Sequence, residues 1–247
     1  MALPEPSPES TCLVTGASSG IGVEIARALA KRGQNLVLLA RRVDRLESLA
    51  SELSDEFGVR VEVLGCDVSD PAARAEVPDR VAQLGLTVEL LVNNAGYGTA
   101  GKFVELDPER EVRMVHVNVE AVTALCSMFV PPMVDRGRGA VLNVASTIAF
   151  QPMPGQAGYA ATKAYVLSFT QALHTELHET GVTATALCPG PVKTEFMDEP
   201  GMEESASALP KPMWLDPAEV AEAGVRGVES GKGIVVPGVA NVASRLI

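Results

Sequence analysis

Short apolar runs without polar alternation recur along this chain, and each is followed by a stretch with helical periodicity. A strand that lacks a polar face must be covered on both sides, which is typical of parallel sheets with helices on both faces. Single helices between such strands supply the crossovers that a parallel sheet requires. We therefore predict an α/β fold with a doubly wound, seven-stranded parallel sheet. The expected strands are 12–14, 36–40, 61–64, 90–92, 140–144, 182–187 and 233–236.

The helical stretches lie between these runs, and no repeat, low-complexity tract or linker divides them. We expect one domain over residues 10–247, preceded by a proline-rich flexible leader over residues 1–9. The expected helices are 20–32, 43–57, 71–84 with a break at Pro78, one from Pro108 toward Pro131, 157–179, and one capped by Asp216 and Pro217.

Charge and cysteine usage exclude several classes of protein. The net charge is −11 and no run of Lys or Arg exceeds a pair, so we expect no nucleic-acid partner. The four cysteines are scattered and no Cys-x-x-Cys occurs, so we expect no metal site. We expect no membrane span, because no apolar run approaches the required length, and no signal peptide. These features favour a cytoplasmic protein.

A glycine-rich turn falls between the first expected strand and the first expected helix, with the spacing G-x-x-x-G-x-G. A turn without side chains lets backbone N–H groups approach a pyrophosphate, and the helix that follows presents its positive end to it. The alternative is a plain loop, since a glycine-rich turn alone is a weak signal. The residues expected to contact a nucleotide here are Gly16, Ser18, Ser19, Gly20, Ile21 and Gly22.

The residues after the second strand select between two nicotinamide cofactors. An acidic residue there would bind the ribose hydroxyls of NAD, whereas this chain has Ala40 followed by Arg41 and Arg42. A guanidinium suits a 2′-phosphate, so we expect NADP(H) to be preferred, with NAD(H) possible and Arg41 the better ligand. The alternative is that both arginines only begin a solvated helix. Later strand ends add Asp67 and Val68 around the adenine and Asn94, Ala95 and Gly96 beside the cofactor.

A tyrosine and a lysine spaced Y-x-x-x-K, Tyr159 and Lys163, lie on one face of an expected helix, and Ser146 stands thirteen residues before the tyrosine. A nearby ammonium would lower the pKa of the phenol, which could then exchange a proton with a carbonyl or alcohol oxygen. Ser146 can polarise the same oxygen, and Asn118 can hold a water that relays protons from Lys163. The alternative, an ordinary helical Tyr–Lys pair, becomes improbable beside the serine and the glycine turn.

Together these motifs resemble the short-chain dehydrogenase/reductase family over roughly residues 10 to 240. The resemblance implies a single Rossmann-type domain, a tetrad of Asn118, Ser146, Tyr159 and Lys163, and contact of Tyr159 and Lys163 with the cofactor. It also implies a homodimer or homotetramer built on the long fourth and fifth helices. The loop after the sixth strand is expected to meet the nicotinamide through Pro189, Gly190, Val192 and Thr194.

The substrate side of this family is walled by loops after the fourth, fifth and sixth strands. An apolar lid over residues 194–214 and the absence of a basic cluster favour a lipophilic ketone or aldehyde as substrate. The alternative is that these side chains only pack the lid or contact a partner subunit. The expected substrate contacts are Tyr97, Phe150, Met153, Phe196 and Met197.

The sequence thus predicts an NADP(H)-dependent oxidoreductase, and two other readings stay open. One is a regulatory protein that senses NADP without turnover, which the intact Ser146, Tyr159 and Lys163 disfavour. The other is a non-redox lyase or epimerase, which requires a further substrate domain or other acid/base residues that the sequence lacks.

Overall fold

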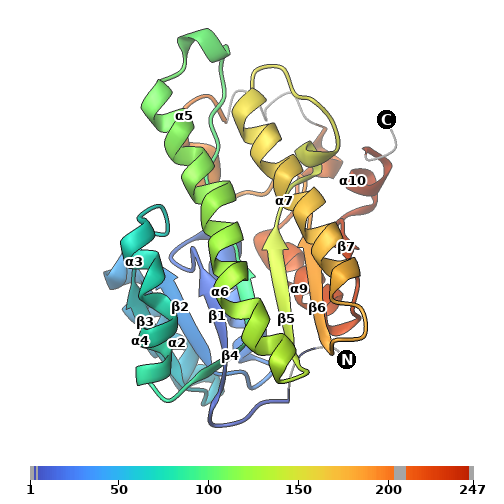
Figure 1. The fold of residues 1–247 in the computed structure, drawn as a ribbon. Helices are drawn as coiled ribbons and strands as arrows, with labels where there is room; N and C mark the ends of the chain where they lie inside the picture. Colours follow the sequence, from blue (N-terminus) through green and yellow to red (C-terminus); the bar gives the residue numbers. More distant parts are fainter. Residues whose placement is uncertain (1–2, 4, 203–209, 245–247) are drawn as a thin grey trace.

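A computed structural model describes residue 3, residues 5–202 and residues 210–244, and within these residues seven strands form one parallel sheet (Figure 1). The order is β3-β2-β1-β4-β5-β6-β7, which confirms the predicted sheet. Two strands begin two or three residues earlier than predicted, because Ser10 and Thr11 of β1 pair with Thr87 and Val88 of β4 before the apolar runs start. The strands are β1 (Ser10–Thr15), β2 (Leu36–Ala40), β3 (Val61–Gly65), β4 (Thr87–Asn93), β5 (Gly139–Val144), β6 (Val182–Leu187) and β7 (Ile234–Val235).

Helices cover both faces of the sheet, and a separate apolar cluster fills each interface. Side chains such as Leu13 and Leu91 point to one cluster, while Cys12 and Leu90 point to the other, as the twofold period of a strand requires. The doubly wound architecture predicted from the uninterrupted apolar strands is confirmed. One layer contains α4 (Val77–Gln83), α6 (Ala121–Asp135) and α7 (Ala157–Glu176), and the other contains α1 (Gly20–Ala30), α2 (Val43–Phe57) and α9 (Pro217–Glu229).

The longest helical segment begins with α5 (Pro108–Val115), passes through a π-helical turn, η2 (His116–Glu120), and continues into α6. It extends past the predicted end at Pro131, because Pro131 and Pro132 lie on the exposed face of the last turns. The carbonyl groups that these two prolines leave without a helical donor can therefore bind water. The helix ends at Asp135 instead.

By length and composition this same segment, Pro108–Asp135, could cross a membrane, and it is the one such helix among the described residues. It is 44% buried inside the molecule, and its buried side chains, including Leu125 and Phe129, belong to the apolar cluster on the sheet. This is how the core helix of a folded domain packs.

The segment predicted as one helix with a break at Pro78 forms two helices, α3 (Pro71–Ala75) and α4. Asp70 caps α3 by accepting a hydrogen bond from the backbone N–H of Ala72 at 2.9 Å. Pro78 occupies the first turn of α4, where a missing N–H is tolerated. The remaining short helices of the described residues are η1 (Phe103–Glu105), η3 (Thr147–Phe150), η4 (Glu195–Asp198), η5 (Lys211–Met213) and α10 (Val239–Ser244).

Part of the predicted leader contacts the sheet: the carbonyl of Ser7 accepts a hydrogen bond from the Asn35 side chain, and the carbonyl of Glu9 accepts one from the N–H of Thr87.

At the opposite end of the sheet, the direction in which successive strands are added reverses between β1 and β4, so the loops that follow these two strands diverge. Ligands of doubly wound proteins bind in the crevice at this switch point, beyond the carboxyl ends of the strands.

Candidate active site

The glycine turn between β1 and α1 is shaped by close backbone approaches. Gly16 and Gly20 have φ angles of +66° and +57°, which side chains disfavour. A Cβ atom on Gly22 would lie 2.3 Å from the carbonyl oxygen of Gly16, so Gly22 is needed to pack the turn onto the helix. Gly22 is the one predicted residue of this turn that does not line the cavity described below.

Hydrogen bonds fix the turn to the loop after β4. The hydroxyl of Thr15 accepts from the backbone N–H groups of Asn94 and Ala95, at 3.0 and 3.1 Å. The Asn94 amide donates in return to the carbonyls of Thr15 and Gly16, at 2.9 and 3.2 Å. A narrow turn, held rigidly at the amino end of α1, fits the pyrophosphate of a dinucleotide.

A cavity of about 520 Å³ runs from this turn across the carboxyl ends of the strands. It brings together sixteen predicted cofactor residues from five separate segments. They are Gly16, Ser18, Ser19, Gly20, Ile21, Arg41, Arg42, Asp67, Val68, Asn94, Ala95, Gly96, Pro189, Gly190, Val192 and Thr194.

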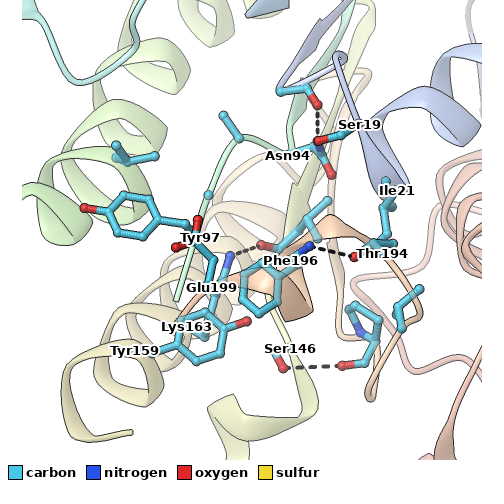
Figure 2. A pocket seen from close by; sticks show the side chains of 18 of the residues that line it. Ser19, Ile21, Asn94, Tyr97, Ser146, Tyr159, Lys163, Thr194, Phe196 and Glu199 are labelled. Atoms are coloured by element: carbon cyan, nitrogen blue, oxygen red, sulfur yellow. Dashed lines mark hydrogen bonds between the residues drawn. The ribbon is translucent and has the colours of Figure 1, made fainter. Parts of the chain in front are cut away.

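Ser146, Tyr159 and Lys163 line the same cavity (Figure 2). The Ser146 hydroxyl interacts with the Tyr159 phenol, and it also donates to the carbonyl of Pro189 at 3.4 Å. The Lys163 ammonium donates to the carbonyl of Val144 at 2.9 Å and lies 5.9 Å from the centre of the Tyr159 ring. The Y-x-x-x-K spacing therefore places both side chains at one site, one helical turn apart.

Burial shifts the pKa values of Tyr159 and Lys163 away from their ordinary values. It raises the pKa of the Tyr159 phenol, an effect that the hydrogen bond from Ser146 opposes. It lowers the pKa of Lys163 to about 8. The sequence predicted that Lys163 lowers the pKa of Tyr159, whereas here desolvation dominates and the direction is opposite. The phenol is therefore protonated at neutral pH.

Asn118 lies in the π-helical turn and does not line the cavity. Its side chain accepts from the backbone N–H of Tyr97 at 3.2 Å and donates to the Tyr97 carbonyl and the Thr162 hydroxyl, at 2.9 and 3.1 Å. The amide thus holds the loop after β4 against α7.

The loop 194–202 packs over Tyr159 at the cavity. The Phe196 ring packs on Tyr159 with ring centres 5.5 Å apart (Figure 2). Met202 is buried and lies 3.2 Å from the Gln156 amide, and Glu199 forms an ion pair with Arg110. Seven residues of the predicted lid, 203–209, lie outside the described residues.

Four of the five predicted substrate residues, Tyr97, Met153, Phe196 and Met197, line the cavity. Phe150 does not, because its side chain packs against the apolar cluster of the α6–α7 layer. Sequence reasoning missed several lining residues that no motif marks. Among them are Ile148, Gln151 and Gln156 between β5 and α7, and Arg113 and Val117 on the long helical segment.

The two arginines after β2 differ in their contacts. The Arg42 guanidinium donates to the Ser18 hydroxyl at 3.2 Å and to Glu195 at 2.9 Å. Arg41 is exposed at the cavity and makes no hydrogen bond to another described residue.

Within the described residues no group of three His, Cys, Asp or Glu side chains forms a metal site.

Residues 10–204 match the short chain dehydrogenase family. A short chain dehydrogenase of Pseudocercospora fijiensis is 38% identical over 189 residues, which is 75% of this chain and only 60% of that protein. A putative ketoacyl reductase of Streptomyces coelicolor is 37% identical over 227 residues, 85% of this chain and 86% of the relative. A solved short-chain dehydrogenase of Sphingobium yanoikuyae in complex with NADPH superposes with a TM-score of 0.85 at 36% identity, covering 96% of this chain and 91% of the other.

Proposed function

Because this chain belongs to the short-chain dehydrogenase/reductase family of oxidoreductases, we propose that it transfers hydride between NADP(H) and a carbonyl or secondary alcohol. The observation that carries this proposal is the meeting of Ser146, Tyr159 and Lys163 in the cavity that begins at the glycine turn. The roles of these residues are part of the proposal.

The bound nicotinamide would supply or accept the hydride. Tyr159, protonated at neutral pH, would give its proton to the carbonyl oxygen during reduction, and Ser146 would donate a hydrogen bond to the same oxygen. Lys163, fixed by the Val144 carbonyl, would bind the ribose hydroxyls and return a proton to Tyr159. Asn118 would support a water on that return path.

Two observations favour NADP(H) over NAD(H). The guanidinium groups of Arg41 and Arg42 border the cavity beyond β2, where a 2′-phosphate would lie, and no carboxylate immediately follows that strand. The Sphingobium yanoikuyae relative was solved with NADPH. Asp67 and Val68 would flank the adenine, and the segment from Pro189 to Thr194 would meet the nicotinamide.

The substrate region favours a lipophilic ketone or aldehyde. Methionines 153, 197, 202 and 213 line it together with Phe196, and flexible thioethers adapt to varied apolar shapes. A ketoacyl reductase among the relatives is consistent with a carbonyl carried on an apolar chain. We further propose a cytoplasmic homodimer or homotetramer that uses the α5–α6 and α7 helices.

The variant Tyr159→Phe tests the proposal. It removes the proton donor and leaves the cavity shape unchanged, so turnover of lipophilic ketones with NADPH should fall by about 10²–10⁴-fold. NADPH binding, followed by fluorescence titration, should stay within about threefold of wild type. The matched control is Tyr165→Phe. Tyr165 is an exposed tyrosine on the same helix, so this variant should retain activity. Full activity of Tyr159→Phe, or NADPH binding without any wild-type turnover, would contradict the proposed chemistry.

A further inference from the structure

Two arginines at the start of α2 share one carboxylate from the loop 194–202. Arg42 Nη1 lies 2.9 Å from Glu195 Oε2, and Arg45 Nη1 lies 2.6 Å from Glu195 Oε1. Each carboxylate oxygen is thus paired with a different guanidinium. The two arginines hold the pKa of the Glu195 carboxyl below its ordinary range, so Glu195 is ionised at neutral pH.

The place of this ion pair coincides with the expected 2′-phosphate position. Arg42 is the N-cap residue of α2 and directly follows the first residue beyond β2. Its Nε donates to the Ser18 hydroxyl at 3.2 Å, which ties the guanidinium to the glycine turn. Ser18, Arg42 and Glu195 all line the cavity. In a doubly wound dinucleotide site, the ribose 2′ substituent is recognised at this strand end.

A carboxylate and a phosphate monoester are bound by guanidinium groups in the same way, through paired N–H donors. They also repel each other, so the two anions cannot share Arg42 without a cost in free energy. We propose that the Glu195 carboxylate competes internally with the cofactor 2′-phosphate for Arg42. Glu195 thereby lowers the preference of the protein for NADP(H) over NAD(H). This inference rests on the proposed NADP(H) function.

The ion pair is weak enough for a ligand to displace it. All three side chains are about half exposed, at 41% for Arg42, 45% for Arg45 and 46% for Glu195. Exposed pairs of this kind change an equilibrium by roughly fivefold at most. The competition therefore adjusts the cofactor preference without abolishing NADP(H) binding.

The test compares binding of 2′,5′-ADP and 5′-AMP, which differ only in the 2′-phosphate, by isothermal titration calorimetry. Glu195→Gln keeps the size of the side chain and removes its charge. It should bind 2′,5′-ADP about three- to fivefold more tightly than wild type and 5′-AMP within about twofold. Asp198→Asn removes the same charge from the same turn, η4, and Asp198 forms no ion pair with another described residue. This control should change neither affinity by more than about twofold.

The possible outcomes distinguish a failure of the Glu195 competition from a failure of the NADP(H) assignment. Unchanged binding of 2′,5′-ADP by Glu195→Gln would overturn the competition. Weaker binding would also overturn it, and would show that Glu195 orients the arginines for the phosphate. Equal tightening by Asp198→Asn would also overturn it, because general charge would then explain the effect. Wild type that fails to prefer 2′,5′-ADP to 5′-AMP would refute the NADP(H) assignment itself, and the competition with it.

Discussion

Tyr159 and Lys163 show how burial acts in opposite directions on an acid and a base. Both side chains are buried, Tyr159 in part under the Phe196 ring, and desolvation disfavours the charged form of each. The phenol therefore stays protonated, ready to act as an acid, while the ammonium pKa falls to about 8. For Lys163 this means that folding has a cost in free energy whenever the ammonium is charged.

The free energy of unfolding should therefore depend on pH through Lys163. The pKa of Lys163 is 10.5 in its usual state and about 8 in the folded protein, so between these values the unfolded chain binds more protons at this residue. The free energy of unfolding should then rise with pH, by at most about 1.4 kcal/mol per pH unit, relative to Lys163→Met. Urea unfolding of wild type and of Lys163→Met from pH 7 to 10 gives the free energy of unfolding of wild type minus that of the variant. Both proteins contain Tyr159, so its titration cancels. If this value for wild type minus variant stays constant or falls above pH 8, the assigned shift is refuted.

At the residue scale, the sequence predicted the site wherever a side chain carries a recognisable motif. The glycine turn, Tyr159, Lys163 and Ser146 follow from spacing along one strand end or one helix face. Phe150 was misassigned because its neighbours in sequence do not reveal which side of a 3₁₀ turn meets the core. The ion pairs of Glu195 were not predicted because its partners, Arg42 and Arg45, are about 150 residues away in the chain.

At the element scale, the turn between β1 and α1 depends on a glycine that does not touch the cavity. In Gly22→Ala, the added Cβ would press on the Gly16 carbonyl at 2.3 Å and displace the turn. We expect stability to fall by about 1–3 kcal/mol in urea unfolding. The affinity for 5′-ADP should fall by roughly tenfold or more, because the pyrophosphate contacts move with the turn.

Gly85→Ala is the control for Gly22→Ala, because it strains the backbone at a glycine that lies outside the turn between β1 and α1. Gly85 has a φ angle of +71°, and a Cβ there meets no atom within 4 Å. Its replacement should lower stability by about 1–2 kcal/mol and leave 5′-ADP binding unchanged. If both variants lost nucleotide affinity alike, the packing role of Gly22 would be wrong.

The strands were predictable because an uninterrupted apolar run is a local signal, and Pro78 marked the break between α3 and α4 in the same way. The π-helical turn at His116–Glu120 was not predictable. It depends on Asn118 reaching the backbone of Tyr97, a contact that exists only once the loop after β4 is folded against the helix. The extension to Asp135 was missed for a similar reason, since only the fold shows that Pro131 faces solvent.

At the scale of the whole molecule, one helical surface among the described residues exposes several large apolar side chains. Val112 and Val115 are exposed on α5, and Tyr165 is exposed on α7, where it stacks on Phe169 with ring centres 5.9 Å apart. The two helices lie side by side on the same face of the sheet (Figure 1). Exposed apolar side chains gathered on paired helices favour association with a second copy.

Removing this apolar character should dissociate the assembly. Sedimentation velocity at micromolar concentration should show a dimer or tetramer for wild type and a monomer for the double variant Val112→Asp/Val115→Asp, because each carboxylate would be desolvated in the interface. Val239→Asp is the matched control, since Val239 is 90% exposed on α10, away from this surface, and its replacement should leave the mass unchanged. A monomeric wild type, or an assembly that survives the double variant, would exclude this surface as the interface. Retained 5′-ADP binding by the monomer would then show that the glycine turn, built within one chain from β1, α1 and the loop after β4, does not depend on assembly.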